Sequence, residues 1–174
     1  MTLPNQNIPS EIRAAQKYFY NPLGIKLDNL EQESESQEYT AYKFIINNLK
    51  ILFRTAKITP TKTGQFVTLW KRVNSGPISP FDSNDLIDLV IISVHQGELR
   101  GHFVFPKNIL LEKKIFSRNN IGGKRAIRVY PPWDRAESRQ AQATQSWQLE
   151  YFFAFGPRIK IDAQKIKLLL SQNS

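Results

Sequence analysis

Two apolar stretches organise this chain, IDLVIISVH (87–95) and LRGHFVFP (99–106). Both are rich in β-branched and aromatic residues, which favour a pleated strand over a helix. Gly97-Glu98 lies between them, and glycine tolerates the backbone conformations that a two-residue turn requires. The two stretches are therefore predicted to form an antiparallel β-hairpin at the centre of the fold.

The turn position also predicts the register of this hairpin. With Gly97-Glu98 as the turn, the numbers of each cross-strand pair sum to 195, so Val90 lies opposite Phe105. Because side chains alternate between the faces of a strand, one face is predicted to be the core and the other to be polar. The core face would carry Val90, Ile92, Val94, Gly101, Phe103 and Phe105, and the polar face Ser93, His95, Arg100 and His102. Both histidines are expected to be hydrogen-bonding groups on the surface.

Further strands are predicted on both sides of the hairpin. YTAYKFII (39–46) and KILFRTAKIT (50–59) flank Asn47-Asn48, and asparagine tolerates the left-handed backbone of a tight turn. QFVTLWKR (65–72) alternates between apolar and polar residues, and AIRVYP (126–131) is rich in strand-forming residues. These stretches predict a second hairpin and two additional strands.

Helices are predicted near both ends of the chain. Apolar residues at helical spacing predict one helix over 8–20 and a short one over 106–114. Asp134 and Glu137 form a helix-start pattern, which predicts a helix from Asp134 to about residue 153. Asp162 is expected to cap a last helix. The acidic segment 28–38, DNLEQESESQE, holds a single leucine and is expected to be a mobile loop.

The order of these elements predicts the α+β class. A chain of 174 residues suits one domain, here residues 1–174. Helices would pack on a mostly antiparallel sheet of five or more strands. A degenerate nuclease-like core of the PD-(D/E)xK type is one form that such a sheet can take.

The composition of the chain excludes some classes of function and favours others. The chain has no cysteine and two histidines, which excludes thiol chemistry and cysteine-ligated zinc. No apolar run is long enough to span a membrane, and the first residues do not form a secretory signal, so we expect a cytoplasmic protein without a membrane partner. Residues 1–38 carry a net charge of −3 and residues 39–174 carry +12. A basic body of this kind attracts polyanions, nucleic acid above all.

Two basic segments are the candidate binding elements. FRTAKITPTKTGQFVTLWKR (53–72) contains no acidic residue, and its threonine-rich turn can hold a phosphate through hydroxyl and backbone N–H groups. KKIFSRNNIGGKRAIRVYPPWD (113–134) places six cations before its first acid and ends in aromatic residues suited to stacking on bases. The residues predicted to bind phosphate or nucleic acid are Arg54, Lys57, Thr59, Lys62, Lys107, Lys124, Arg125, Arg128, Tyr130 and Trp133.

The open end of the central hairpin suggests a catalytic alternative. Asp88 falls opposite Lys107, which predicts a cross-strand ion pair. An acid on one strand and a lysine on the next resembles the PD-(D/E)xK nuclease layout, in which carboxylates hold a divalent metal. The residue two before the lysine is Phe105 rather than an acid, so one metal ligand is missing. A nuclease would need Mg²⁺ or Mn²⁺ and a third acid such as Glu11, Asp85 or Asp134.

Several motifs together resemble the MepB family of small bacterial proteins. They are FRTAKITPTK (53–62), GQFVTLW (64–70), FVFPK (103–107), GKRAIRVYPPWD (123–134) and TQSWQ (144–148). The resemblance covers most of the chain from about residue 39 onward. It implies a nuclease-like α/β fold and nucleic-acid binding, without an agreed catalytic activity or substrate.

The leading hypothesis is a nucleic-acid-binding protein that contacts phosphates through a basic groove between the two basic segments. It needs no cofactor or metal and no complete catalytic site. The first alternative is a metal-dependent nuclease or phosphotransferase that uses Asp88 and Lys107. The second is a pocket for a nucleotide or another small phosphorylated ligand, formed by Thr59, Thr61, Lys62, Lys107 and Arg125. A domain that binds an acidic protein is a further alternative.

Overall fold

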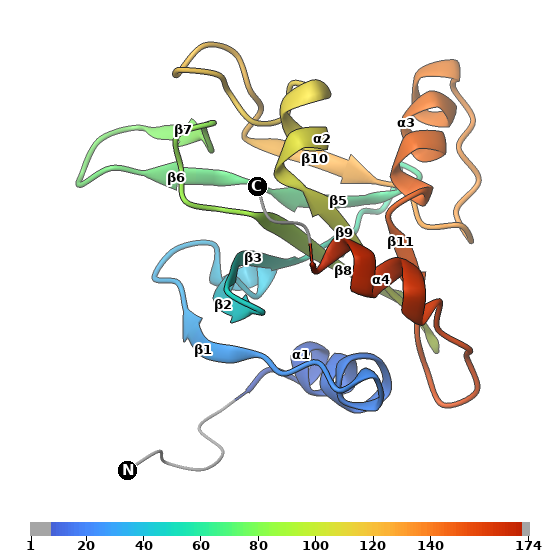
Figure 1. Ribbon diagram of the computed structural model, residues 1–174. Coiled ribbons are helices and arrows are strands. Elements are labelled where there is room, and N and C mark those ends of the chain that lie inside the picture. Colours follow the sequence, from blue (N-terminus) through green and yellow to red (C-terminus); the bar gives the residue numbers. More distant parts are fainter. Residues whose placement is uncertain (1–7, 172–174) are drawn as a thin grey trace.

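The computed structural model describes residues 8–171, and its centre is the predicted hairpin of β8 (Leu89–Gln96) and β9 (Leu99–Pro106) (Figure 1). The register is the expected one, with Val90 opposite Phe105 and Gln96 opposite Leu99. Gly97 adopts a φ of 59°, the positive value that a turn of this kind needs. Turn chemistry and side-chain alternation were therefore sufficient to predict this element.

A six-stranded sheet extends from the hairpin in the order β1-β2-β3-β8-β9-β11. Its other strands are β1 (Asp28–Gln32), β2 (Tyr42–Ile46), β3 (Leu49–Thr55) and β11 (Phe152–Ala154). β2 and β3 form the second predicted hairpin, and Asn47 and Asn48 both adopt positive φ in its turn. β3 pairs with β8 in parallel, whereas the other pairs of this sheet are antiparallel. A parallel pair requires a long connection, and residues 56–88 provide it.

This connection and the later chain build a second, smaller sheet. It contains β10 (Ala126–Val129), β5 (Gln65–Thr68) and β4 (Lys57–Ile58), paired in that order. A ribbon of β6 (Trp70–Arg72) and β7 (Ile78–Pro80) lies beside it.

The helices are short. They are α1 (Ser10–Ala15), α2 (Lys107–Glu112), α3 (Arg139–Leu149) and α4 (Ala163–Leu169), with helical turns η1 (Gln16–Tyr20), η2 (Asn21–Leu23) and η3 (Gln37–Tyr39). The predicted helix over 8–20 is present as α1 followed by η1. Asp162 caps α4 as expected, because its carboxylate accepts a hydrogen bond of 3.1 Å from the Lys165 N–H.

Two hydrophobic cores lie on opposite faces of the six-stranded sheet. α1, η1 and α4 cover one face with residues such as Ile12, Phe19 and Ile166. The small sheet and α2 cover the other with residues such as Val67, Ile127 and Leu110. The predicted core face of the hairpin is indeed buried, but Ser93 and His102 on the face predicted to be polar are buried too. The molecule is thus an α+β domain with a mixed central sheet between two layers.

His102 is the clearest consequence of the second core. Its side chain is fully buried among aromatic residues, and its Nδ1 lies 2.9 Å from the Tyr20 hydroxyl. The prediction of a surface histidine was wrong for His102, because α1 and η1 cover this part of the sheet. It holds for His95, which is exposed near the hairpin turn.

Several predicted elements differ from the structure. The strand predicted over 50–59 is divided into β3 and β4, and the strand predicted over 65–72 into β5 and β6. The segment 28–38 is not a loop throughout, because Asp28–Gln32 forms the edge strand β1 and Gln37–Tyr39 forms a helical turn. The helix predicted to begin at Asp134 begins at Arg139 instead, and the Ser138 hydroxyl caps it by accepting from the Ala141 N–H at 3.0 Å. Its predicted end at residue 153 is also wrong, since residues 152–154 pair with β9 as β11.

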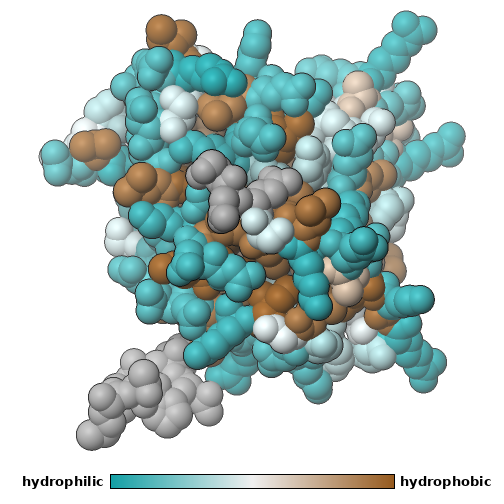
Figure 2. All heavy atoms as spheres, viewed as in Figure 1, coloured by the Kyte–Doolittle hydropathy of each residue, from teal (hydrophilic) through white to brown (hydrophobic). Residues whose placement is uncertain are grey.

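The surface seen in Figure 2 is largely hydrophilic, with hydrophobic residues scattered among the polar ones. Within residues 8–171, none of the helices has the length and apolar character needed to cross a bilayer.

Candidate nucleic-acid interface

A groove of about 560 Å³ lies between the small sheet and α3. We refer to it as the basic groove. The residues that line it are Lys62, Phe66, Lys113, Ile115, Lys124, Ala126, Ile127, Arg128, Tyr130, Ser138, Gln140, Ala141, Thr144, Trp147 and Gln148. It therefore joins residues from both basic segments that the sequence singled out, and adds one face of α3.

The charge of the basic groove has a single sign. Its charged lining residues are Lys62, Lys113, Lys124 and Arg128, and the lining includes no aspartate or glutamate. The first turn of α3 also faces it through Ser138, and a helix N-terminus carries a partial positive charge. With no carboxylate to neutralise these cations, the groove has a positive potential suited to phosphate groups.

A row of cross-strand neighbours forms the sheet side of this site. Lys57 pairs with Phe66, and Phe66 pairs with Arg128, so the three side chains lie on one face of the small sheet. The opposite face carries Val67 and Ile127, which are buried in the core. The Arg128 guanidinium lies 6.0 Å from the centre of the Phe66 ring. Alternation along short strands thus directs two cations away from the core.

Arg128 also holds the threonine-rich loop. Its guanidinium donates to the Thr59 hydroxyl at 2.8 Å and to the carbonyl oxygens of Thr63 and Gly64 at 3.3 and 3.4 Å. These contacts attach residues 59–64 to β10 and determine where Lys62 stands at the edge of the groove. Arg128 therefore adds a positive charge to the groove and also fixes the position of the loop that carries Lys62.

Two glutamines of α3 attach the helix to the end of β10. The Gln148 side chain accepts from the Tyr130 N–H at 2.8 Å and donates to the Arg128 carbonyl at 2.9 Å. Gln145 donates to the carbonyl oxygens of Pro131 and Asp134 at 3.0 and 2.8 Å. The two side chains thereby hold the backbone both before and after Tyr130 in the chain.

Aromatic rings lie among the cations of the groove. The ring centre of Trp147 lies 5.3 Å from that of Phe105 in the core, and the Lys113 ammonium lies 5.7 Å from the ring centre of Trp147. Tyr130 and Phe66 are half-buried, so part of each ring reaches the groove. Cations next to partly accessible rings are the arrangement that binds nucleotides through phosphate contacts and stacking.

The structure sorts the predicted binding residues into three groups. Lys62, Lys124, Arg128 and Tyr130 line the basic groove. Lys57 and Thr59 stand beside it, Lys57 with its ammonium 4.6 Å from the Tyr39 ring centre and Thr59 bonded to Arg128. Arg54, Lys107, Arg125 and Trp133 do not line it.

Arg54 was wrongly predicted to contact phosphate. Its side chain is 2% exposed, and its guanidinium forms an ion pair with Glu33 and a hydrogen bond of 2.9 Å to the Phe53 carbonyl. Burial lowers the pKa of Arg54, while the Glu33 carboxylate opposes that shift. The residue is buried because the acidic segment after β1 covers the end of β3.

Trp133 and Arg125 are less suited to binding nucleic acid than predicted. Trp133 is half-buried with its ring centre 5.9 Å from that of Phe152, and its indole N–H is buried without a partner. It is a packing residue rather than an exposed stacking surface. Arg125 is exposed, but its contact is through the backbone, where its carbonyl accepts from the Leu69 N–H at 2.8 Å.

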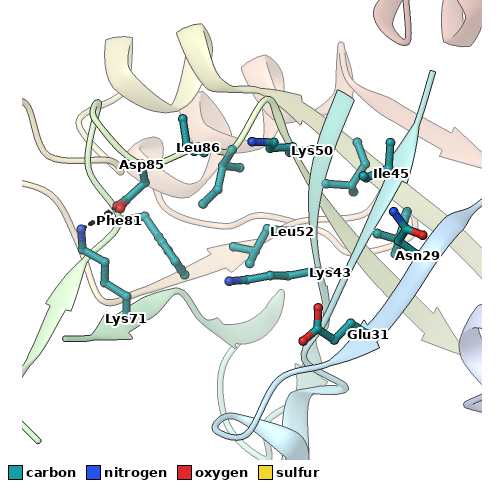
Figure 3. A pocket seen from close by; sticks show the side chains of 13 residues that line it. Asn29, Glu31, Lys43, Ile45, Lys50, Leu52, Lys71, Phe81, Asp85 and Leu86 are labelled. Carbon is teal, nitrogen blue, oxygen red and sulfur yellow. Dashed lines mark hydrogen bonds and ion pairs between the residues drawn. The ribbon is translucent and has the colours of Figure 1, made fainter. Parts of the chain in front are cut away.

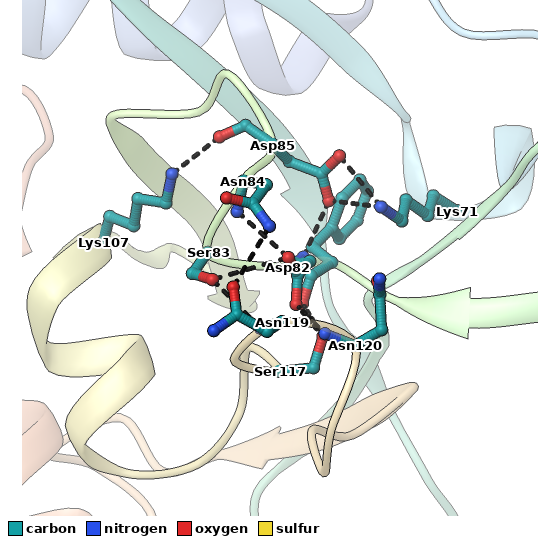
Figure 4. A network of polar contacts seen from close by, with 10 residues as sticks. Lys71, Asp82, Ser83, Asn84, Asp85, Lys107, Ser117, Asn119 and Asn120 are labelled. Carbon is teal, nitrogen blue, oxygen red and sulfur yellow. Dashed lines mark hydrogen bonds and ion pairs between the residues drawn. The ribbon is translucent and has the colours of Figure 1, made fainter.

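Asp88 and Lys107 are neighbours through the backbone only. The Lys107 N–H donates to the Asp88 carbonyl at 3.0 Å, as the hairpin register requires. Their side chains turn to other partners: the Asp88 carboxylate accepts from the Lys50 N–H at 2.7 Å, and the Lys107 ammonium donates to the Asp85 carbonyl at 2.6 Å (Figure 4). The predicted ion pair between them was wrong.

The carboxylates near Lys107 are also engaged. Asp85 pairs with Lys71 at 2.7 Å and accepts from the Asp82 N–H. Asp82 is buried and accepts from the Ser117 hydroxyl and the Asn120 N–H, both at 2.7 Å, and these hydrogen bonds lower its pKa (Figure 4). No cluster of three or more His, Cys, Asp or Glu side chains that could bind a metal occurs in residues 8–171.

A second hollow of about 560 Å³ lies beside β2 and β3 (Figure 3). Three lysines line it, Lys43, Lys50 and Lys71, together with Glu31 and Asp85. Lys71 is paired with Asp85, as Figure 3 shows, so part of its charge is neutralised. The basic groove is the better candidate for a polyanion because its cations face no acid.

Eleven of the fifteen groove residues were absent from the predicted site, among them Lys113, Trp147 and Gln148. Lys113 belongs to the second basic segment, and the density of charge in that segment was the signal for it. Trp147 and Gln148 lie outside both basic segments, in the TQSWQ (144–148) motif. Their position at the groove depends on how α3 packs, so the motif marks these two residues without placing them beside the cations.

Comparison with known proteins agrees with the motifs. The MepB-like family model matches residues 33–154. This chain belongs to the MepB-like family. A crystal structure of MepB is 36% identical, with a TM-score of 0.72 over 77% of this chain and 89% of that one. The matched range of the MepB-like family contains every residue that lines the basic groove.

A weaker similarity is to the structure of a bacterial homing endonuclease, I-Ssp6803I. It is 18% identical, covers 80% of this chain and 86% of that chain, and has a TM-score of 0.44, which is too low to support a conclusion. No curated protein matches this MepB-like chain.

Proposed function

We propose that this MepB-like protein binds nucleic acid in the basic groove without acting on it catalytically. The observation that carries the proposal is the groove lining, in which four cations and three aromatic rings occur together with no carboxylate. Lys62, Lys124 and Arg128 would contact phosphates. Lys113, which directly follows α2, would be the fourth cation. Contacts of this kind carry little sequence information, so binding would be weakly specific.

The electrostatic basis of the proposal predicts a salt dependence. Each phosphate neutralised by a cation releases bound counterions, which gives a slope of log affinity against log salt of about −0.7 to −0.9 per contact. Four groove cations therefore predict a slope of about −3. A ligand held mainly by apolar contacts would show a much shallower slope.

The test is a titration of a fluorescent oligonucleotide at several salt concentrations, followed by anisotropy. The double substitution Lys62→Gln with Lys124→Gln removes two exposed groove cations. The matched control, Arg158→Gln with Lys160→Gln, removes two exposed cations from the loop before α4. We expect the groove variant to lose at least about tenfold in affinity and one to two units of salt slope, with little change in the control. Equal losses in both variants would mean that net charge, not the groove, attracts the ligand.

A small phosphorylated ligand is the second candidate, and the groove volume favours it. About 560 Å³ lies within the range of pockets that enclose one small molecule. Of the residues predicted for such a pocket, Lys62 lines the groove, whereas Lys107 and Arg125 do not. Saturating mononucleotide should then raise the melting temperature of the protein. Thermal stabilisation by mononucleotides without oligonucleotide binding would replace the leading proposal with this one.

A further inference from the structure

We infer that residues 31–36 act as an internal competitor, and that the cationic surface beneath them binds the phosphate backbone of a nucleic acid that extends beyond the basic groove. We refer to residues 31–36 as the acidic strap. This inference rests on the proposed function and adds a second binding surface, together with the segment that covers it.

A hollow of about 420 Å³ lies between the acidic strap and the strands β3 and β6. The body of the protein lines it with four cations and two aromatic rings, from Lys43, Arg54, Lys71, Arg72, Trp70 and Phe81. The acids of the lining are Glu31, Glu33 and Glu35, and all three belong to the strap. Without the strap, this surface would resemble the basic groove, whose lining also combines four cations and aromatic rings with no carboxylate.

The carboxylates of the strap contact these cations directly. Glu33 forms the ion pair with Arg54, and its Oε1 atom lies 3.7 Å from the Lys43 ammonium. The Glu35 carboxylate accepts a hydrogen bond of 2.9 Å from the Arg72 Nε–H. Carboxylates on a row of lysines and arginines make the same charge-assisted contacts as the phosphates of a nucleic acid. The strap therefore occupies the surface as a polyanion would.

Arg54 is the buried centre of this surface. Its contacts to Glu33 and to the Phe53 carbonyl both use the NH1 nitrogen, whereas its Nε–H is buried without a hydrogen-bond partner. A guanidinium has five N–H donors in a planar fork that matches a phosphate in a bidentate manner. Glu33 thus leaves part of this donor capacity unused. A phosphate in the place of Glu33 would use more of it.

The backbone on either side of the strap is strained. Ser36 and Thr40 adopt φ values of 58° and 51°, in the left-handed region that side-chain-bearing residues rarely enter. Asn29 has a φ of 54°, and the pairing of β1 with β2 shifts register between Asp28 and Glu31. Conformations of this kind cost free energy and occur at segments that change position. Release of the strap would relieve this strain, which reduces the cost of exposing the cations.

The covered surface is continuous with the basic groove. Phe66 lines the groove, and its ring centre lies 6.2 Å from that of Tyr39 in η3, directly after the strap. β6, which carries Trp70 and Arg72, continues from β5, which carries Phe66 (Figure 1). A strand of nucleic acid that leaves the groove past Phe66 would therefore meet the strap. The strap limits the length of nucleic acid that the protein can contact.

The test compares two fluorescent oligothymidylates on the full-length protein, one of about six nucleotides and one of about twenty. Glu35→Gln releases Arg72 and changes only an exposed side chain. We expect it to raise affinity for the longer probe about threefold to tenfold, with little change for the shorter one. The control Glu98→Gln removes an exposed acid at the β8–β9 turn. Equal gains for both probes, or an equal gain in the control, would overturn the inference.

A second substitution tests whether the released cation causes the gain. Arg72→Gln in the Glu35→Gln background should return the affinity for the longer probe to the native value, because the cation that the strap had neutralised is gone. Binding of the shorter probe should not change. A gain that persists without Arg72 would contradict the proposed surface.

Hydrogen exchange of the native protein tests whether the strap moves. The amides of Glu33, Tyr39 and Thr40 donate to backbone carbonyls at 2.9, 3.0 and 3.0 Å and are protected while the segment is in place. Addition of the longer probe should make them exchange faster, whereas a ligand usually slows exchange where it binds. Unchanged or slower exchange at these amides would mean that the strap stays in place, and the inference would be wrong.

Failure of the inference is distinct from failure of the proposed function. If neither probe binds at low salt, both fail. If both probes bind, Lys62→Gln with Lys124→Gln weakens them equally, and Glu35→Gln has no effect on the longer one, the proposed function stands and the inference alone fails.

Discussion

The Arg128 guanidinium donates a hydrogen bond of 2.8 Å to the Thr59 hydroxyl and so connects a strand of the small sheet to the loop that carries Lys62. Thr59 and Arg128 are far apart in the chain but belong to the two basic segments that the sequence singled out. Their contact means that the groove depends on loop position as well as on charge.

Removing this contact without changing charge should therefore weaken binding. Thr59→Val deletes the hydroxyl acceptor and retains side-chain shape, and we expect a roughly threefold to tenfold loss of oligonucleotide affinity because the loop becomes less ordered. The salt slope should not change, since every cation remains. Thr61→Val, at an exposed position of the same loop, serves as the control. A change in salt slope, or an equal effect of both valines, would contradict this positioning role.

The buried ion pair of Glu33 and Arg54 should matter for stability. Arg54 is 2% exposed, and Glu33→Gln would leave its charge without a carboxylate partner. Breaking a buried pair in this way should lower the free energy of unfolding by on the order of 2–4 kcal/mol. Urea denaturation measures this loss, and Glu31→Gln, an exposed neighbour on β1, should change little. Similar unfolding midpoints for the two variants would show that the pair contributes nothing.

Gln148 should be essential for the attachment of α3. The residue is buried, and Gln148→Leu would leave the Tyr130 N–H and the Arg128 carbonyl without their side-chain partner. We expect a loss of about 2–3 kcal/mol in unfolding free energy, together with weaker oligonucleotide binding, because the groove wall is displaced. Gln164→Leu makes the same change at an exposed position of α4. A native melting temperature in Gln148→Leu would refute the assignment.

His102 should make stability depend on pH. Burial lowers the pKa of His102 to about 3, whereas an unfolded histidine titrates near 6.5. Below the unfolded pKa the unfolded chain takes up a proton that the folded chain does not, so stability is fully present above about pH 6.5 and falls as pH decreases. The expected loss is about 1.4 kcal/mol per pH unit below that point.

Denaturation at pH 7.5 and pH 5 measures this dependence. The double substitution His102→Leu with Tyr20→Phe removes both members of the buried hydrogen bond and should flatten the curve over this interval. His95→Gln alters the exposed histidine and should retain the native dependence. If the exposed histidine accounts for the pH dependence instead, His95→Gln will flatten the curve and the double variant will retain the native dependence.

Local sequence was enough to predict much of the fold. The register of β8 and β9 followed from Gly97 and from side-chain alternation, and the β2–β3 turn followed from Asn47 and Asn48. The family also followed from short motifs. These features were predictable because turn conformation and strand alternation depend on residues that are close together in the chain.

The binding site was only partly predictable from the same information. The density of cations indicated Lys62, Lys124 and Arg128, and the aromatic residues at the end of the second basic segment indicated Tyr130; all four line one groove. The sequence could not distinguish these residues from Arg54, because a cation in a basic stretch gives the same pattern whether its side chain is exposed or held in a buried ion pair. Nor could it add Trp147, which reaches the groove only because α3 packs beside the small sheet.

By itself, then, the sequence determined the two central hairpins with their turns, the family and the excess of positive charge after residue 38. Only the tertiary structure decided which charges remain available. Glu33 neutralises Arg54 across the sheet, Asp85 holds Lys71, and α1 with η1 buries His102. These outcomes depend on contacts between residues distant in the chain, and the free energy of a charge is set by what surrounds it in space rather than by its neighbours in sequence.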